Sequence, residues 1–341
     1  MNTCSDCNAD ISNSWWPWWK TSEPCSADSC SNRLCSKCAS KHPLIPYDET
    51  NEHSNDLHIN NKVKCYCKSC FERISTLDFS RTSDRIVPPS GVNPSGMTFV
   101  FAHGAGGSRK MFFGHATLLA EKYGHTCILF DLPGHATKLD VPLTLESAAT
   151  TLKDVLDEHK IITGEKTVHV GGSLGAYIGF YLLKEFSSHF SSAILLDCGQ
   201  NVGPGKSFKA AAGLWFLSSL GAYLSKKAIL GAMLNEVKKS KADYKLVETC
   251  FGSGMYFEQT EAHVNCLRAV APAEYLPELP FPILFMNGSE DYRDSEDKWL
   301  ALCKMREQSE LKVYQGGDHF FTHDTRFLHD MLERWDAFSR K

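Results

Sequence analysis

The sequence predicts an α/β protein with a parallel-rich sheet and a helical cap, preceded by a small cysteine-rich unit that zinc stabilises. Three observations lead to this prediction. Strand-like and helix-like segments alternate over residues 97–341, nine of the fourteen cysteines lie in the first 70 residues, and a stretch rich in Pro and Gly separates the two regions. We therefore place a zinc-stabilised finger at 1–75, a linker at 76–96 and the α/β domain at 97–341.

The elements of the second domain are read from its apolar runs. Six short runs rich in branched or aromatic residues have the composition of buried strands, at 98–101, 127–130, 168–170, 193–196, 283–286 and 311–314. Helix-like stretches lie between them, at 110–123, 145–159 and 176–186. Such alternation is typical of a parallel sheet covered by helices. The interval 202–270 has no clear strand and is rich in Ala, Leu and Lys, so we expect it to form the cap.

Charge and hydropathy exclude several classes of protein. The 36 basic and 40 acidic side chains give a net charge of -4, so no bulk positive field would attract nucleic acid. The longest weakly polar stretch, 210–224, is shorter than the roughly 20 residues of a membrane-spanning helix. The first residues show no basic stretch followed by an apolar one, so we expect no secretory signal and a cytoplasmic protein.

The cysteines of the first region have the spacing of metal ligands. Three pairs follow C-x2-C and one follows C-x4-C: Cys4 and Cys7, Cys35 and Cys38, Cys67 and Cys70, and the wider pair Cys25 and Cys30. In a reducing compartment, thiols this dense are expected to bind metal rather than to form disulfides. A closed structural zinc site takes four such ligands, so four pairs predict two zinc ions and leave Cys65 over.

The order of these pairs, with the segments CSNRLCSKCAS at 30–40 and VKCYCKSCF at 63–71, resembles a FYVE-type zinc finger over residues 4–75. The resemblance implies a cross-brace, in which Cys4 and Cys7 share one zinc with Cys35 and Cys38, and the other two pairs share the second. It also implies contact with phosphatidylinositol 3-phosphate on endosomal membranes through a basic run beside the third cysteine. Residues 21–28 lack that run, and residues 1–75 carry eight basic against nine acidic side chains, which argues against phosphoinositide binding.

A tryptophan cluster lies where that family carries its membrane-inserting loop, and it consists of Trp15, Trp16, Trp18 and Trp19. Two interpretations stay open. Tryptophan is favoured at membrane interfaces and in partner contacts, because its ring is apolar and its N–H is polar. A finger of about 70 residues also has little core, so the rings can instead pack against the zinc sites or the neighbouring domain.

A nucleophile, a base and an acid follow three of the predicted strands. Residues 171–175 read Gly-Gly-Ser-Leu-Gly between a strand and a helix, which is the context of a nucleophile elbow around Ser173. A serine needs a base to remove its proton, and the base needs a third group to orient it. His319, after the last strand, is our candidate base, and Asp291 is favoured over Glu290 and Asp294 as the acid.

The loop 103–107, His-Gly-Ala-Gly-Gly, follows the first strand of this domain. Acyl transfer places negative charge on a carbonyl oxygen, and we expect the backbone N–H groups of Ala105 and Leu174 to stabilise it. A phosphate cradle is not favoured, because neither G-x-G-x-x-G nor a lysine-bearing P-loop is present. We expect His103 and His135 to support loops.

Together these motifs make residues 97–340 similar to an α/β-hydrolase, in the order His103, the segment Asp-Leu-Pro-Gly-His at 131–135, Ser173, Asp291 and His319. The resemblance implies a serine hydrolase that cleaves a carboxylic ester, or a thioester, through an acyl-enzyme without a catalytic cofactor. The apolar cap segment at 214–217 favours a lipid ester, and the finger would target the enzyme to a membrane or a protein partner. The alternative is an inactive zinc-finger adaptor that uses the hydrolase fold as a binding scaffold.

Overall fold

The computed structural model describes residues 71, 75–163, 166–199, 240, 242, 252–257, 259–291 and 296–341, and the backbone of four two-residue strands before them. Those strands form two antiparallel pairs: β1 (Glu23–Pro24) with β2 (Arg33–Leu34), and β3 (Pro43–Leu44) with β4 (Lys64–Cys65). The eight predicted zinc ligands, the tryptophan cluster at 15–19 and most of the predicted cap at 202–270 lie outside the described residues.

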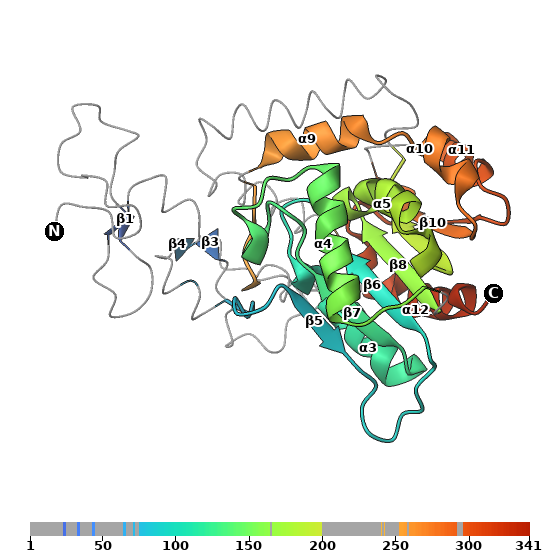
Figure 1. Cartoon of the computed structure of the whole chain (residues 1–341), viewed down its shortest axis with the longest axis horizontal. Coiled ribbons are helices and arrows are strands. Elements are labelled where there is room, and N and C mark those ends of the chain that lie inside the picture. Colours follow the sequence, from blue (N-terminus) through green and yellow to red (C-terminus); the bar gives the residue numbers. More distant parts are fainter. Residues whose placement is uncertain are drawn as a thin grey trace.

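The α/β domain is built on a seven-stranded sheet with the order β11-β10-β9-β8-β6-β7-β5 (Figure 1). Its strands are β5 (Ser83–Ile86), β6 (Thr98–Ala102), β7 (Thr126–Phe130), β8 (Thr167–Gly172), β9 (Ser192–Leu196), β10 (Ile283–Gly288) and β11 (Glu310–Tyr314). All neighbours pair in parallel except β5, which is antiparallel to β7. All six predicted strands are present, so the prediction of a parallel-rich sheet is confirmed.

Helices cover both faces of the sheet, and for this reason the central strands are apolar on both sides. The helices are α3 (Phe113–Tyr123), α4 (Leu145–Glu158), α5 (Leu174–Glu185), α9 (Thr260–Ala269), α10 (Pro272–Tyr275), α11 (Glu296–Lys304) and α12 (Thr325–Ser339). Short 3₁₀ helices are η2 (Arg109–Phe112), η3 (Ala136–Lys138), η4 (Ser187–His189), η5 (Leu276–Glu278) and η6 (Phe321–His323). Among the described residues, no helix has the length and apolar composition needed to cross a bilayer.

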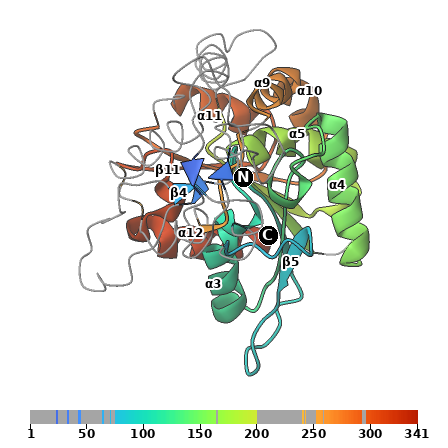
Figure 2. The same ribbon diagram turned by 90° about the vertical axis from the view of Figure 1, so that its left-hand side faces the viewer.

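Two separate cores result from the alternation of side chains along each strand. On β6, Val100 and Ala102 belong to the core under α4 and α5, whereas Phe99 and Phe101 belong to the core under α3 and α12. Figure 2 accordingly shows α3 and α12 on one side of the view and α4 and α5 on the other.

Helix α4 illustrates how the sequence sets a helix start. The Thr144 hydroxyl accepts the N–H of Ser147 at 3.1 Å, and the Ser147 hydroxyl accepts the N–H of Thr144 at 2.9 Å. This reciprocal cap satisfies two backbone donors that the first turn leaves unpaired. Behind the cap, Leu145, Leu152 and Leu156 face the core at helical spacing.

Strand β5 corrects our linker prediction for 76–96. Residues 83–86 pair with β7, and Leu77 is buried, so this part of the interval belongs to the folded domain, whereas residues 87–96 form a largely exposed loop. The sequence Ser-Asp-Arg-Ile has no apolar run that would indicate a strand. Its buried Asp84 is tolerated because Arg109 and Lys110 form ion pairs with it, a long-range compensation that local pattern cannot show.

Candidate active site

The carboxyl ends of neighbouring parallel strands bring the predicted catalytic residues to one edge of the sheet. Strand β8 leads into Ser173, β10 leads to Asp291, β11 leads to His319, and β6 leads into the loop 103–107. In open α/β sheets this edge is where ligands bind. The sheet order therefore gathers residues that are up to 216 positions apart in the chain, from 103 to 319.

Ser173 occupies the sharp turn between β8 and α5. Its backbone has φ 49° and ψ -114°, a conformation that residues other than glycine rarely adopt. Its N–H donates to the Leu196 carbonyl at 2.9 Å, which ties the turn to β9. Gly175 permits the close approach of α5 to β6, because a Cβ there would lie 2.3 Å from the carbonyl oxygen of Ala102. The elbow predicted from the motif is thus present as a strained turn.

Asp291 and His319 are in direct contact. The Asp291 Oδ2 and His319 Nδ1 atoms lie 2.6 Å apart, and the two side chains are 1% and 15% exposed. An ionised carboxylate only accepts hydrogen bonds, so Nδ1 carries the proton and donates to Asp291. This leaves the lone pair on Nε2, which is the atom that a general base uses.

The loop 103–107 presents the N–H of Ala105 as a candidate oxyanion donor. The N–H groups of Gly104, Gly106 and Gly107 donate to Met111 Sδ, His135 Nε2 and the Gly104 carbonyl, respectively. In the part of the chain that the structure describes, the N–H groups of Ala105 and of Leu174, the first residue of α5, have no such acceptor. These are the two donors predicted to stabilise an oxyanion.

Two buried histidines support this loop, as predicted. His135 accepts the Gly106 N–H at Nε2 (3.2 Å) and lies 2.9 Å from the Pro133 carbonyl through Nδ1, so the proton is on Nδ1. His103 accepts the Leu132 N–H at Nε2 at 3.0 Å. Burial lowers the pKa of His135 to about 3 and that of His103 to about 4, which keeps both rings neutral and able to accept.

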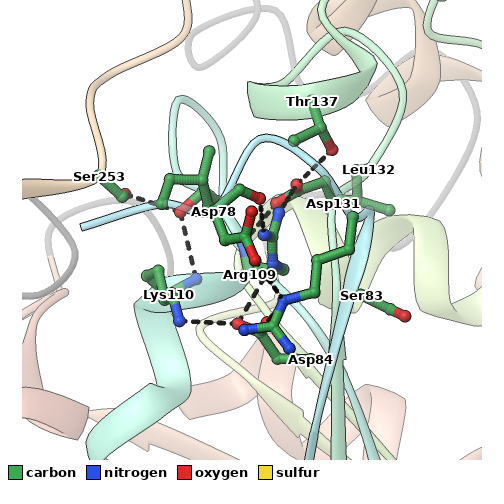
Figure 3. A network of polar contacts seen from close by, with 12 residues as sticks. Asp78, Ser83, Asp84, Arg109, Lys110, Asp131, Leu132, Thr137 and Ser253 are labelled. Carbon is green, nitrogen blue, oxygen red and sulfur yellow. Dashed lines mark hydrogen bonds and ion pairs between the residues drawn. The ribbon is translucent and has the colours of Figure 1, made fainter. Parts of the chain in front are cut away.

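A buried charge network, which the sequence analysis did not identify, anchors the residues directly after the loop (Figure 3). The Arg109 guanidinium pairs with Asp131 and, through Nε at 3.2 Å, with Asp84. Lys110 Nζ lies 2.7 Å from the same Asp84 carboxylate, and Thr137 donates to Asp131 at 2.7 Å. The network joins η2 to β5 and to the end of β7, so it limits the movement of the loop that precedes it.

The segment 252–257 lies directly against the same loop. The N–H of Tyr256 donates to the Gly106 carbonyl at 2.8 Å, and the hydroxyls of Ser108 and Ser253 are 2.7 Å apart. Gly106 has φ +73°, and a Cβ there would lie 2.2 Å from the ring of Phe257, so only glycine fits. This segment comes from the predicted cap interval and, like His135, bonds to the backbone of Gly106.

Asp197 is a further acidic residue at this edge that the sequence analysis did not identify. One carboxylate oxygen of Asp197, one of Asp291 and one ring nitrogen of His319 all lie within 4.8 Å of one another. A usable signal was present in the sequence, because Asp197 directly follows the predicted strand 193–196 and so lies at the same edge as the other site residues.

Comparison with solved structures agrees with the fold. An esterase from Thermogutta terrifontis has a TM-score of 0.60 at 17% identity, with 79% of this chain and 98% of that chain covered. An esterase from Exiguobacterium antarcticum gives 0.58 at 17% identity (76% and 95% covered), and an N-formylmaleamic acid deformylase from Pseudomonas putida gives 0.53 at 16% identity (74% and 95% covered). At these identities the likeness shows the fold alone, and the proteins compared are named for different chemistries.

A search of the curated proteins finds no match to the sequence. The family model described as "Alpha/beta hydrolase family" matches residues 99–332, which include the loop 103–107, the elbow and the Asp291–His319 pair. This match covers more than half of the chain, and the chain belongs to the alpha/beta hydrolase family.

Proposed function

We propose that the protein is a serine hydrolase that cleaves carboxylic esters through an acyl-enzyme. The observation that carries the proposal is the placement of Ser173 in a strained turn at the sheet edge where Asp291 holds His319 by a 2.6 Å hydrogen bond. A nucleophile on such a turn, a base, and an acid that orients the base are the three groups that acyl transfer requires. Two of the structural neighbours are esterases, which supports this substrate class.

In the proposed reaction, Ser173 Oγ attacks the ester carbonyl carbon while its proton passes to His319 Nε2. The Asp291 carboxylate holds the ring in the Nδ1–H tautomer and stabilises the positive ring that results. His319 then gives the proton to the leaving alcohol as the ester C–O bond breaks. In the second half, His319 takes a proton from water, the hydroxide attacks the acyl-enzyme, and the proton returns to Ser173.

The negative charge that develops on the carbonyl oxygen is stabilised by the N–H groups of Ala105 and Leu174. Both donors are unused in the described structure, and the loop that carries Ala105 is fixed by His135 and Tyr256. Preorganised donors of this kind contribute about 3–4 kcal/mol each to the barrier, because they need no reorientation during the reaction.

The test is hydrolysis of p-nitrophenyl esters of increasing acyl length by the purified protein and by Ser173→Ala at equal folded concentration. We expect turnover by the parent and its loss in the variant, and labelling of Ser173 by a fluorophosphonate probe. The acyl length that is cleaved fastest then decides between short esters and lipid esters. Absence of both turnover and labelling in the folded parent would refute the proposal and favour the binding scaffold.

We also propose that the N-terminal cysteine pairs hold two structural zinc ions, through Cys4, Cys7, Cys35 and Cys38 at one and Cys25, Cys30, Cys67 and Cys70 at the other. Thiolates at this spacing are the donor set that zinc prefers, and zinc supplies a stabilising cross-link where a short segment has little core. Strands β1 and β2 end immediately before Cys25 and Cys35, and strand β4 ends two residues before Cys67. Elemental analysis of the full chain should find about two zinc ions, and a value near zero in protein purified without chelator would contradict the assignment.

A further inference from the structure

Asp197 is a buried acidic residue that the proposed reaction does not yet use. It follows β9, which lies in the sheet between β8, the strand before Ser173, and β10, the strand before Asp291. Its N–H donates to the Met286 carbonyl at 3.1 Å, so its backbone stays paired with β10 beyond the end of β9. The residue is only 5% exposed.

The backbone of Asp197 has φ +54°, in the left-handed region. Most residues with a Cβ avoid this region, and Asn and Asp tolerate it best among them. From this position after β9, the carboxylate lies near residues that follow β10 and β11. The result is the cluster in which atoms of Asp197, Asp291 and His319 lie within 4.8 Å of one another.

Two carboxylates thus face one imidazole ring. Asp291 is bonded to Nδ1 of His319. At a separation of no more than 4.8 Å, Asp197 acts on the same ring through its charge, in a place where little solvent is present to screen it.

We propose that Asp197 is a positioning residue for this reaction, a second carboxylate that stabilises the protonated form of His319. The inference rests on the proposed serine-hydrolase function. The proton passes from Ser173 Oγ to His319 Nε2 and leaves with the alcohol, while Asp197 neither gains nor loses a proton. Its role is to make His319 a stronger base in the step that activates Ser173.

Other charged groups near the ring are more exposed or already paired. Among the described residues, Asp318 in the loop of His319 interacts with the ring, and Asp324, Arg326 and Glu290 form the charged group around Asp318. Arg326 pairs with Asp324, with Nε 2.9 Å from Oδ2. Asp318 is half-buried, and burial raises its pKa. Asp318 is therefore the matched control, a neighbouring carboxylate that solvent reaches.

The test compares the parent with Asp197→Asn, Asp197→Gly and Asp318→Asn. Asn and Gly both accept a positive φ, so both variants remove the charge without opposing the backbone. The first readout is an NMR titration of the His319 ring, assigned with His319→Gln, which does not depend on turnover. We expect both Asp197 variants to move the titration midpoint down by about one pH unit, the size of an opposite charge at this range, and Asp318→Asn to move it by less than half as much.

The second readout is kcat/KM for p-nitrophenyl acetate as a function of pH. We expect both Asp197 variants to lose about tenfold in kcat with little change in KM, and the acid limb of the pH profile to follow the NMR midpoint. A purely structural role predicts that Asp197→Gly, which suits the φ angle, behaves as the parent in both readouts. Midpoints that stay at the parent value, or that move no further than in Asp318→Asn, would overturn the inference.

The two proposals fail in different ways. Turnover that depends on Ser173 with no shift in the Asp197 variants removes the role of Asp197 and leaves the hydrolase intact. No turnover and no probe labelling removes the hydrolase function, and with it the role of Asp197 as a positioning residue, whatever the ring titration shows.

Discussion

His319 is held by a residue 28 positions away in the sequence, and the proposed reaction depends on that contact. The carboxylate of Asp291 fixes which nitrogen carries the proton. Glu290, the neighbouring acid in the sequence, is exposed. At the residue scale, the choice between the two acids is therefore decided by which of them reaches the ring.

We expect Asp291→Asn to lower kcat by about 10³–10⁴-fold in ester hydrolysis, because an amide can present its N–H to Nδ1 and favour the wrong tautomer. The matched control is Glu290→Gln, which changes an exposed acid beside it and should leave kcat within about twofold. Both are measured by steady-state hydrolysis of p-nitrophenyl acetate. A larger loss in Glu290→Gln than in Asp291→Asn would show that the acid is misassigned.

Gly175 tests the elbow without removing a reacting group. In Gly175→Ala the new methyl group would meet the Ala102 carbonyl at 2.3 Å, so α5 must move away from β6 and carry the Leu174 N–H with it. We expect the free energy of unfolding to fall by about 1–3 kcal/mol and ester turnover to fall at least tenfold.

Gly96→Ala is the control for the steric effect, because a Cβ at Gly96 would meet nothing within 4 Å, and its positive φ (+75°) accounts for the small cost that remains. Gly96→Ala should lower the free energy of unfolding, measured by urea denaturation, by about 1 kcal/mol and should leave turnover unchanged. Equal turnover in the two variants would contradict the role that we assign to the elbow.

At the scale of elements, the loop 103–107 keeps its shape because three separate parts of the chain contact it or the residues after it. His135 follows β7, the segment 252–257 belongs to the C-terminal part of the predicted cap interval, and Asp84 lies on β5. Arg109 is the common point of the charge network, with its side chain fully buried. Strand β5 is thus part of the support of the site, although it precedes the family match at 99–332.

We expect Arg109→Met to lower the free energy of unfolding by about 3–5 kcal/mol, because it leaves buried carboxylates without their guanidinium partner. Urea denaturation followed by circular dichroism measures this. Arg85→Met, which removes an exposed arginine from the same strand as Asp84, should change it by less than about 0.5 kcal/mol. Similar small losses in both variants would mean that the network is not a source of stability.

At the scale of the whole molecule, the interior holds many neutral histidines. Burial lowers the pKa of five of them to about 3 or 4: His103, His115, His135, His169 and His323. In the unfolded chain a histidine has an ordinary pKa of about 6.5. The unfolded state therefore binds protons first as the pH falls, and the folded state loses stability relative to it.

The sign of this linkage predicts acid sensitivity in a defined range. Stability should be constant above about pH 7 and should fall below about pH 6.5, by roughly 1.4 kcal/mol for each such histidine per pH unit. Carboxylates contribute little to the change in stability between pH 7.5 and 5.5, since their ordinary pKa values lie near 4. Urea denaturation at these two pH values measures the effect.

His323→Gln provides the control for the acid sensitivity, because this variant has one buried histidine fewer that can bind a proton on unfolding. Its stability should depend on pH less steeply than that of the parent, by about one proton, even if its stability at pH 7.5 is lower. Identical stability of the parent at pH 7.5 and 5.5 would contradict the prediction.

The sequence by itself determined the parallel-rich sheet, because each of the six predicted strands is a short run rich in branched or aromatic residues. It also singled out Ser173, Asp291 and His319 as the proposed reacting groups, since each of them follows a recognisable strand. Tertiary structure alone decided three features: the strand at Ser83–Ile86, the partner of Arg109, and the approach of Asp197 to His319. The physical reason is the same for all three. Each feature depends on a buried charged side chain whose neighbour is distant in the sequence. The local periodicity of apolar residues carries no information on such contacts.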